Sequence, residues 1–318
     1  MTYKSTLVTF FFDLTQLEDS IPSTRPSEFY LNHGRNTLSV DNPMVIFCDS
    51  TYKSKIEEIR NTVCPNSPTV YIEKNINTYD HYRLNWPLLD KNRPKPGSRV
   101  NRSYFLTMTF KYVALLIASQ RNDFSTSHYT WIDFGCSHVA PIDYIKNAKA
   151  LLDNPRPKIG VCYIHYRTSN ELMDSSMYCN KGSCGTAGGI ISVEKAYMTT
   201  LYARYMRIFY EHIEKNIWHS DEQIMTYCLT RHPELFDYYY GDYKSLLVNY
   251  HEIKMDWHHI RWYYLEKALT DNNFKAAHDC IIKILESLKK GYFKISETDA
   301  DELIELETKI RQLKNHNN

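Results

Sequence analysis

The chain has 318 residues, enough for one large domain or for a large and a small one. Hydrophobic residues make up 43% and charged residues 24%, a balance typical of globular proteins and not of disordered ones. The formal net charge of +1 excludes the strongly basic surface of a dedicated nucleic-acid-binding protein, so we expect no nucleic-acid partner.

No secretion signal or membrane span is recognisable in the sequence. The N-terminal apolar run is short and lacks a small-residue cleavage site, and no segment approaches the ~20 apolar residues that cross a bilayer. The eight cysteines have no repeating spacing. Cys179 and Cys184 are spaced closely enough for a zinc site, but no second Cys/His pair is suitably placed. We therefore expect free thiols and a cytoplasmic protein.

Strands and helices alternate at the start of the chain. Two apolar, β-rich runs, Ser5–Phe12 and Pro43–Ser50, are predicted to be buried strands. A helix is expected over Tyr52–Val63 and a third strand over Thr69–Glu73. This order predicts an α/β fold with a mostly parallel sheet flanked by helices.

A polar segment broken by prolines, Leu88–Asn101, separates this part from the next. We predict a basic loop here, either solvated or able to close over a diphosphate; it carries Lys91, Arg93, Lys95 and Arg99 and is followed by Arg102.

The middle of the chain continues the alternation. An amphipathic helix is expected over Phe105–Arg121, which contains Lys111, and strands over Tyr129–Asp133 and Ile159–Tyr166. The Gly-rich stretch 181–192 is predicted to be a turn or a ligand-binding loop, and long helices should follow over Val193–Trp218 and Asp221–Thr230.

From about residue 255 the predicted elements are helices only, over Trp257–Leu269, Phe274–Lys290 and Asp299–Leu313. We therefore divide the chain into a catalytic domain, residues 1–254, and a TPR-like helical extension, residues 255–318. One helical hairpin cannot bury its own apolar face, so it should dock on the main domain or on a partner. A homodimer through these helices is one possibility.

Aspartates follow three of the predicted strands. Asp133 closes a strand in the context Trp131–Gly135, and Asp13 and Asp49 end the first two strands. In a parallel sheet these carboxylates share the edge where ligands bind. There Asp133 can hold a divalent cation against a pyrophosphate, or simply cap the following turn.

A second group of candidates lies after the Gly-rich stretch. Gly188 and Gly189 let the backbone approach a ligand, or form a tight turn. Asp221 and Glu222 open a helix behind the N-cap residue Ser220, where acidic residues also favour the helix dipole. As a functional alternative, either carboxylate can take the proton of an acceptor hydroxyl.

His251 is a candidate for a metal or diphosphate contact, although most single histidines are not ligands. Lys111 and Arg60 are candidates for neutralising a diphosphate, on the basis of their placement alone.

The chain contains, in order, LVTFFFDL, PMVIFCDS, IEEIR, TWIDFG, TAGGIIS, SDEQ, HPELF and GDYKSLLVNY. This succession, from about residue 5 to residue 250, resembles the HtrL/YibB-like family, which is related to WlaTC-type bacterial glycosyltransferases. The resemblance implies a GT-A-like, Rossmann-type fold that takes a nucleotide-diphospho-sugar donor with Mn²⁺ or Mg²⁺.

By position, the resemblance implies that Val8, Thr9 and Asp13 line the nucleotide pocket. It implies that Asp133 is the first carboxylate of a metal-binding DxD element. Gly188 and Gly189 would lie under the donor sugar or the acceptor, and Asp221 and Glu222 match the acidic motif on the acceptor side. Gly135 stands where the usual motif has its second carboxylate.

The sequence thus predicts a glycosyltransferase of the hexosyl or N-acetylhexosaminyl class that moves a sugar, with a UDP-sugar as the expected donor, to a hydroxyl of a glycan or related acceptor. It leaves open whether the reaction inverts or retains configuration. Two alternatives remain: a non-catalytic glycan- or protein-binding module on a decayed transferase fold, and a metal-dependent phosphohydrolase.

Overall fold

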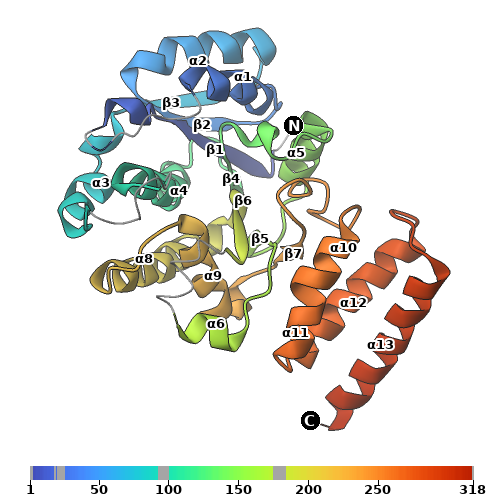
Figure 1. The fold of residues 1–318 in the computed structure, drawn as a ribbon. Helices are drawn as coiled ribbons and strands as arrows, with labels where there is room; N and C mark the ends of the chain where they lie inside the picture. Colours follow the sequence, from blue (N-terminus) through green and yellow to red (C-terminus); the bar gives the residue numbers. More distant parts are fainter. Residues whose placement is uncertain (1–2, 18, 20–25, 92–99, 175–183, 317–318) are drawn as a thin grey trace.

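The computed structural model of the protein describes residues 3–17, 19, 26–91, 100–174 and 184–316 (Figure 1). Three basic residues of the predicted loop, Arg93, Lys95 and Arg99, lie outside the described residues. So does Cys179, one of the two cysteines considered for a zinc site.

Seven strands form one sheet in the order β3-β2-β1-β4-β6-β5-β7. Neighbouring strands are parallel except at β6, which runs antiparallel to both β4 and β5. The strands are β1 (Ser5–Phe11), β2 (Met44–Cys48), β3 (Thr69–Glu73), β4 (His128–Ile132), β5 (Ile159–Tyr163), β6 (Thr186–Glu194) and β7 (Tyr239–Tyr240). The predicted α/β fold with a mostly parallel sheet flanked by helices is confirmed.

Helices cover both faces of the sheet (Figure 1). They are α1 (Ser27–Leu38), α2 (Ser50–Val63), α3 (Asp80–Asn85), α4 (Arg102–Arg121), α5 (Tyr144–Asp153), α6 (Ser169–Met173), α8 (Met198–Glu214) and α9 (Asp221–Arg231). Side chains alternate along β1, so that Leu7 and Phe11 pack with α1, α2 and α5, whereas Val8 and Phe10 pack with α4, α8 and α9. Two hydrophobic layers result, one on each face of the sheet.

The Gly-rich stretch differs from its prediction. From Thr186 onward, its residues form, with Val193 and Glu194, the nine-residue strand β6 in the interior of the sheet, where all but the last residue are buried. Val193 belongs to this strand, so the following helix begins only at Met198. Glycine usually weakens a strand, but here it permits a close backbone approach, which is described below for Gly188.

The C-terminal extension is helical, as predicted. It consists of α10 (Trp257–Ile260), a π-helical turn (Arg261–Leu265), α11 (Glu266–Thr270), α12 (Phe274–Lys289) and α13 (Glu297–His316). Its buried side chains, including Tyr264, Leu265, Ala277 and Ile281, belong to the same hydrophobic cluster as α4 and α8. The extension therefore packs on the main domain, beside β7 (Figure 1).

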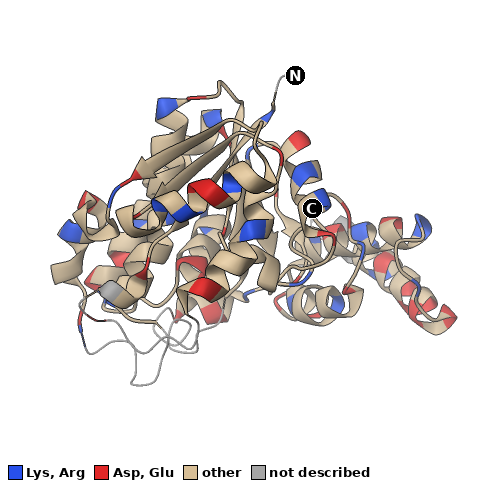
Figure 2. Ribbon diagram, turned by 90° about the horizontal axis from the view of Figure 1, so that it is seen from above, with Lys and Arg blue, Asp and Glu red and all other residues tan. Residues whose placement is uncertain are grey.

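Charged residues of both signs are mixed along the helices (Figure 2). In α13, for example, Lys309 pairs with Glu305 and Arg311 with Glu307, each one helical turn away. None of the described helices is long and apolar enough to cross a membrane.

Candidate functional site

The candidate site lies at the edge of the sheet where the parallel strands end. β2, β1 and β4 are adjacent and parallel, so Asp49, Asp13 and Asp133, which follow them, share this edge as predicted. The backbone N–H of Asp13 donates to Asp49 Oδ2 at 3.0 Å, and the Tyr52 hydroxyl donates to Asp13 Oδ2 at 3.0 Å. Burial tends to raise the pKa of Asp13, but hydrogen bonds led by those from Thr15 lower it overall. Asp13 is therefore held as an anion beside Asp49.

Asp133 is oriented by two donors. The indole Nε1 of Trp131 lies 2.6 Å from Asp133 Oδ1, and Lys111 Nζ lies 3.4 Å from the same oxygen. The side chain of Asp133 is still 40% exposed. Among the described residues, every hydrogen bond and ion pair recorded for this carboxylate goes to Oδ1, which leaves Oδ2 for a ligand.

Lys111 is the centre of a group that we call the Asp133 cluster, which also contains Asp133, Gly188 and Asp221. It projects from the middle of α4 with only 1% of its side chain exposed. Its ammonium donates to the backbone oxygen of Gly188 at 2.9 Å and pairs with Asp221 Oδ2 at 2.9 Å, in addition to Asp133. The ammonium thus makes hydrogen bonds to Gly188 and Asp133 and an ion pair with Asp221. The structure thus joins Lys111 to the protein's own carboxylates. The sequence analysis instead offers this lysine as a contact for the diphosphate of a nucleotide.

The charges around Lys111 shift its pKa. Burial by itself lowers the pKa of a lysine, but the carboxylates of Asp133 and Asp221 more than compensate and raise it above its ordinary value. The ammonium therefore stays charged over the whole physiological range. It neutralises part of the negative charge that these carboxylates bring together.

Asp221 and Glu222 occupy the first turn of α9. The Ser220 hydroxyl caps this helix, as predicted, by accepting the N–H of Glu222 at 3.1 Å. Burial raises the pKa of Asp221, and the Lys111 charge offsets part of that shift. Burial also raises the pKa of Glu222, and the neighbouring charge of Asp221 raises it further. Of the two carboxyls, Glu222 is the less buried and has no ion pair among the described residues.

Glu222 bridges two parts of the site. Its Oε1 accepts the backbone N–H of Gly188 at 2.7 Å, and its Oε2 accepts the hydroxyl of Tyr243 at 2.8 Å. Sequence reasoning missed Tyr243, because it follows β7, a strand of two residues that leaves no alternating pattern to read. The GDY motif that contains it was the available signal.

The two glycines of β6 have different neighbours. A Cβ on Gly188 would lie 2.6 Å from Asp221 Oδ2 and 3.1 Å from Lys111 Nζ, so a side chain at this position would displace the ion pair. A Cβ on Gly189 would meet Leu246 at 3.3 Å and Asp133 Oδ2 at 3.8 Å. The structure thus brings Gly188 close to Asp221 and Gly189 close to Asp133.

Three other predicted residues lie elsewhere. Val8 and Thr9 have no exposed surface, so their side chains belong to the core and do not line a nucleotide pocket. Arg60 is also buried, and its guanidinium donates to the backbone oxygens of Leu38, Val40 and Asn42. It therefore holds the end of α1 in place rather than neutralising a diphosphate.

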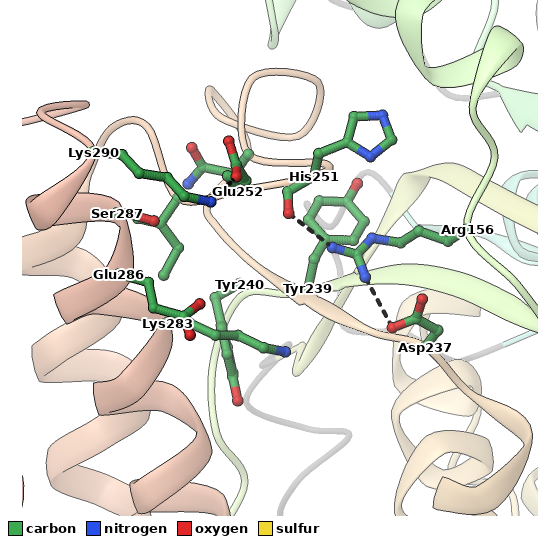
Figure 3. Close-up of a pocket in the computed structure, with 12 residues that line it drawn as sticks. Arg156, Asp237, Tyr239, Tyr240, His251, Glu252, Lys283, Glu286, Ser287 and Lys290 are labelled. Atoms are coloured by element: carbon green, nitrogen blue, oxygen red, sulfur yellow. Dashed lines mark hydrogen bonds and ion pairs between the residues drawn. The ribbon is translucent and has the colours of Figure 1, made fainter.

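His251 lines a cavity of ≈ 340 Å³ between the sheet and α12 (Figure 3). Here Arg156 pairs with Asp237 at 2.8 Å and donates to the backbone oxygen of His251 at 3.4 Å, while Lys290 pairs with Glu252. Burial and the charge of Arg156 lower the pKa of His251. None of the residues lining this cavity belongs to the Asp133 cluster, so the structure does not support His251 as a metal ligand beside Asp133.

By themselves, the described residues supply few ligands for a metal ion. Among them, no group of three or more His, Cys, Asp or Glu side chains is arranged to hold one. Gly135 brings no second carboxylate, and the Lys111 ammonium lies between Asp133 and Asp221. The chemistry of Asp133 Oδ2 still fits Mg²⁺ or Mn²⁺ of the kind that one or two carboxylates hold together with substrate phosphates.

Comparison with known proteins places the chain in a family. The HtrL_YibB family model, described as "Bacterial protein of unknown function", matches residues 72–251. This range contains Lys111, Asp133, Gly188, Asp221 and Glu222. No curated protein sequence matches this chain.

Several solved structures are similar at low sequence identity. Mouse xyloside xylosyltransferase 1, in its apo form, is 10% identical over 74% of this chain and 83% of its own, with a TM-score of 0.43. The apo form of the bifunctional glycosyltransferase WbbM is 11% identical over 72% of this chain and 38% of its own, with a TM-score of 0.39. The Mycobacterium tuberculosis protein Rv0371C, in complex with manganese, is 12% identical over 76% of this chain and 90% of its own, with a TM-score of 0.33.

Likenesses at this level say nothing of substrate or mechanism, whereas the family match covers more than half of the chain. On that match, and on the motifs that carry it, the protein is a member of the HtrL_YibB family.

Proposed function

We propose that this protein is a glycosyltransferase that moves a hexosyl or N-acetylhexosaminyl group from a nucleotide-diphosphate sugar, with a UDP-sugar as the expected donor, to a hydroxyl of a glycan or related acceptor. One observation carries the proposal. Asp133 and Asp221, far apart in the sequence, are joined by Lys111 at the carboxyl edge of a mostly parallel sheet. Ligands of open α/β sheets bind at this edge.

The donor would lie toward β1 and β2. Asp13 and Asp49 are the polar groups there, and the exposed carboxylate of Asp133 is the proposed anchor of the diphosphate through Mn²⁺ or Mg²⁺. When bound, such an ion supplies Lewis-acid stabilisation of the leaving diphosphate. Lys111 acts indirectly, because it fixes the positions of Asp133 and Asp221 relative to each other.

The acceptor would lie on the side of α9. Glu222 is the proposed base for the acceptor hydroxyl if the reaction inverts configuration, since a carboxyl of raised pKa is a better proton acceptor than an ordinary one. If the reaction retains configuration, Asp221 and Glu222 would instead position the donor sugar. Both outcomes keep these residues at the reacting centre.

The alternative of a binding module without catalysis also has an observation in its favour. Among the described residues, no group of three or more His, Cys, Asp or Glu side chains could hold a metal ion, and an ammonium already lies between Asp133 and Asp221. Such a module would bind a glycan or a protein but would release no nucleotide from a donor sugar.

We also propose that the catalytic domain spans residues 1–254 and the helical extension residues 255–318, and that a homodimer would form through the extension. Sedimentation of the purified chain, alone and at increasing concentration, tests the dimer.

Thermal unfolding with UDP, GDP and a panel of nucleotide sugars, with and without Mn²⁺, tests the donor site. A ligand that binds only the folded protein stabilises it by roughly 2.7 kcal/mol at a hundredfold excess over Kd. Asp133→Asn should lose the Mn²⁺-dependent part of the shift. Asp80→Asn is the matched control, since Asp80 is an exposed aspartate on α3. If no nucleotide raises the unfolding temperature of the unaltered chain, the proposed donor site is wrong.

Turnover distinguishes the two alternatives. A transferase releases UDP from its donor in the presence of an acceptor, and Glu222→Gln should reduce this release strongly without changing the UDP-dependent shift. A chain that binds UDP but never releases it from any donor sugar supports the binding module.

A further inference from the structure

Three aromatic rings form a compact group beside the candidate site. The ring centroids of His165 and His259 are 5.2 Å apart and nearly parallel, and Tyr263 lies 4.8 Å from the first and 4.6 Å from the second. Tyr263 is 46% exposed, and the two histidines are half-buried. We call these three residues the ring cluster. It presents a partly exposed aromatic surface that the proposed mechanism does not use.

The ring cluster lies at the same edge of the sheet as Asp133. β6 is antiparallel to both β4 and β5, so β4 and β5 run in the same direction. His165, two residues after the end of β5, therefore follows its strand at the edge where Asp133 follows β4. The His259 imidazole is hydrogen-bonded to the backbone oxygen of Ile164 at 2.9 Å, which fixes the extension against this edge.

One chain of contacts leads from the ring cluster to Glu222. Arg167 contacts His165 Nδ1 at 3.1 Å and donates to the backbone oxygen of Cys184 at 2.7 Å, and the Cys184 side chain is hydrogen-bonded to Glu222. On the other side, β7 is parallel to β5, so Tyr243, which donates to Glu222, also follows a strand at this edge. The ring cluster is therefore a near neighbour of the acceptor side of the site.

The backbone under Tyr263 is unusual. Residues Arg261–Leu265 form a π-helical turn, which is rare in proteins and frequent at functional sites. The carbonyl of Tyr263 accepts the N–H of Tyr166 at 2.8 Å, so the turn is tied directly to the segment after β5. This backbone contact holds the Tyr263 ring against His165.

We propose that the ring cluster binds a sugar ring of the acceptor, and that the C-terminal extension thereby completes the acceptor site. The proposal adds a binding site for the acceptor to the function proposed above. It rests on that function, because only a transferase has an acceptor. A pyranose ring has an apolar C–H face, which packs on aromatic faces, and hydroxyls that a polar rim can bind. Burial, with the nearby charges of Arg167 and His259, lowers the pKa of His165 to about 4, so its ring is uncharged at neutral pH.

A nucleobase would also stack on such rings, but the topology favours the sugar. The strands β1 and β2, with Asp13 and Asp49, lie on one side of β4, whereas β5 and β7 lie on the other. A donor anchored at Asp133 with its nucleotide toward β1 leaves the half of the edge that holds the ring cluster to the acceptor.

Saturation-transfer NMR on the full chain tests the proposal with defined probes: methyl β-D-glucopyranoside, methyl β-D-galactopyranoside and methyl N-acetyl-β-D-glucosaminide. We expect transfer to the ring protons of at least one glycoside, and binding about tenfold weaker in Tyr263→Ala, the loss of one stacking partner. Tyr263→Phe keeps the ring and should keep binding. Trp262→Ala is the matched control, since Trp262 is a 60% exposed aromatic on the same turn that is not part of the ring cluster.

The outcomes separate this inference from the proposed function. No transfer to any glycoside, or equal binding by Tyr263→Ala and the unaltered chain, overturns the ring cluster as a sugar site. The UDP-dependent thermal shift is measured on the same variants. If Tyr263→Ala abolishes that shift, the ring cluster serves the nucleotide and the assignment to the acceptor is wrong. If the chain binds a glycoside at Tyr263 but binds no nucleotide, the ring cluster is still a sugar site and the proposed transferase function is wrong.

Discussion

Lys111 Nζ lies 2.9 Å from Asp221 Oδ2, with 1% of the lysine side chain and 7% of the aspartate side chain exposed. This ion pair joins the middle of α4 to the first turn of α9, and Asp133 shares the same ammonium. Because both charges are buried, removing either one leaves the other without compensation.

Replacing Lys111 by methionine should therefore destabilise the protein strongly. We expect a loss of about 3–5 kcal/mol, the usual cost of breaking a buried ion pair on one side only. Chemical denaturation measures it. The double variant Lys111→Met/Asp221→Asn removes both charges and should lose less than the sum of the single variants. If the double variant loses as much stability as the two single variants together, the two residues do not interact.

Gly188 should tolerate no side chain. Its alanine variant places a methyl group 2.6 Å from Asp221 Oδ2, so the buried ion pair would have to shift to make room for it. We expect a loss of stability of about 1–3 kcal/mol, as for other overpacked sites. Gly189→Ala is the control, because its nearest contact would be Leu246 at 3.3 Å, and it should lose less. Equal decreases in unfolding temperature would contradict this account of β6.

The carboxyl of Glu222 should titrate above the ordinary range for glutamate, since burial and the charge of Asp221 raise its pKa. The hydroxyl of Tyr243 donates to the ionised form and so lowers that pKa in part. Tyr243→Phe should therefore move the titration to still higher pH. NMR of ¹³C-labelled glutamate carboxyls follows it, with Glu222→Gln identifying the signal. A midpoint that falls in Tyr243→Phe would contradict the assigned direction.

The same shift affects stability. A carboxyl whose pKa is raised on folding keeps a proton that the unfolded chain has already released. Its contribution to stability is present at acidic pH and is lost as the pH rises through the folded pKa. Glu222→Gln should remove this dependence, so its stability should fall less than that of the unaltered chain as the pH rises through that pKa.

Arg60→Met should affect stability and leave nucleotide binding unchanged. The guanidinium satisfies the carbonyls of Leu38, Val40 and Asn42 in the interior, and losing a buried donor costs about 1–3 kcal/mol for each group left unpaired. Asp133→Asn should show the opposite pattern, with the stability of the free protein kept and the Mn²⁺-dependent shift lost. A UDP shift that depends on Arg60 would restore it as a diphosphate contact.

Local patterns predicted most elements well. The strand Thr69–Glu73 was predicted with its observed bounds, and α2, α4 and α9 begin within three residues of their predictions. Apolar runs, helical spacing and the cap at Ser220 are short-range features, so they are visible in sequence. The helix α1 was not among the predicted elements, because Ser27–Leu38 has a weak apolar stripe in which Leu31 and Leu38 are the buried hydrophobic residues.

The differences between these sequence predictions and the structure share a physical cause. β6 was not recognised as a strand because its glycines suggest a turn, and only the packing of α9 against it explains them. Lys111 and Arg60 were assigned to a diphosphate by placement alone, whereas a buried cation binds whichever acceptors the fold brings to it. The sequence offers His251 for a metal or diphosphate contact, but the chain turns after β7 and carries it to the junction with α12.

The sequence by itself determined the α/β alternation, the aspartates that close β1, β2 and β4, the capped acidic turn of α9 and the helical end of the chain. These follow from propensity and periodicity within a few residues. The tertiary structure alone decided that Lys111 joins Asp133 to Asp221, that Tyr243 donates to Glu222, and that the extension brings Tyr263 to His165. Such pairs depend on how distant segments pack, because a side chain's partner is set by the whole fold and not by its neighbours in the chain.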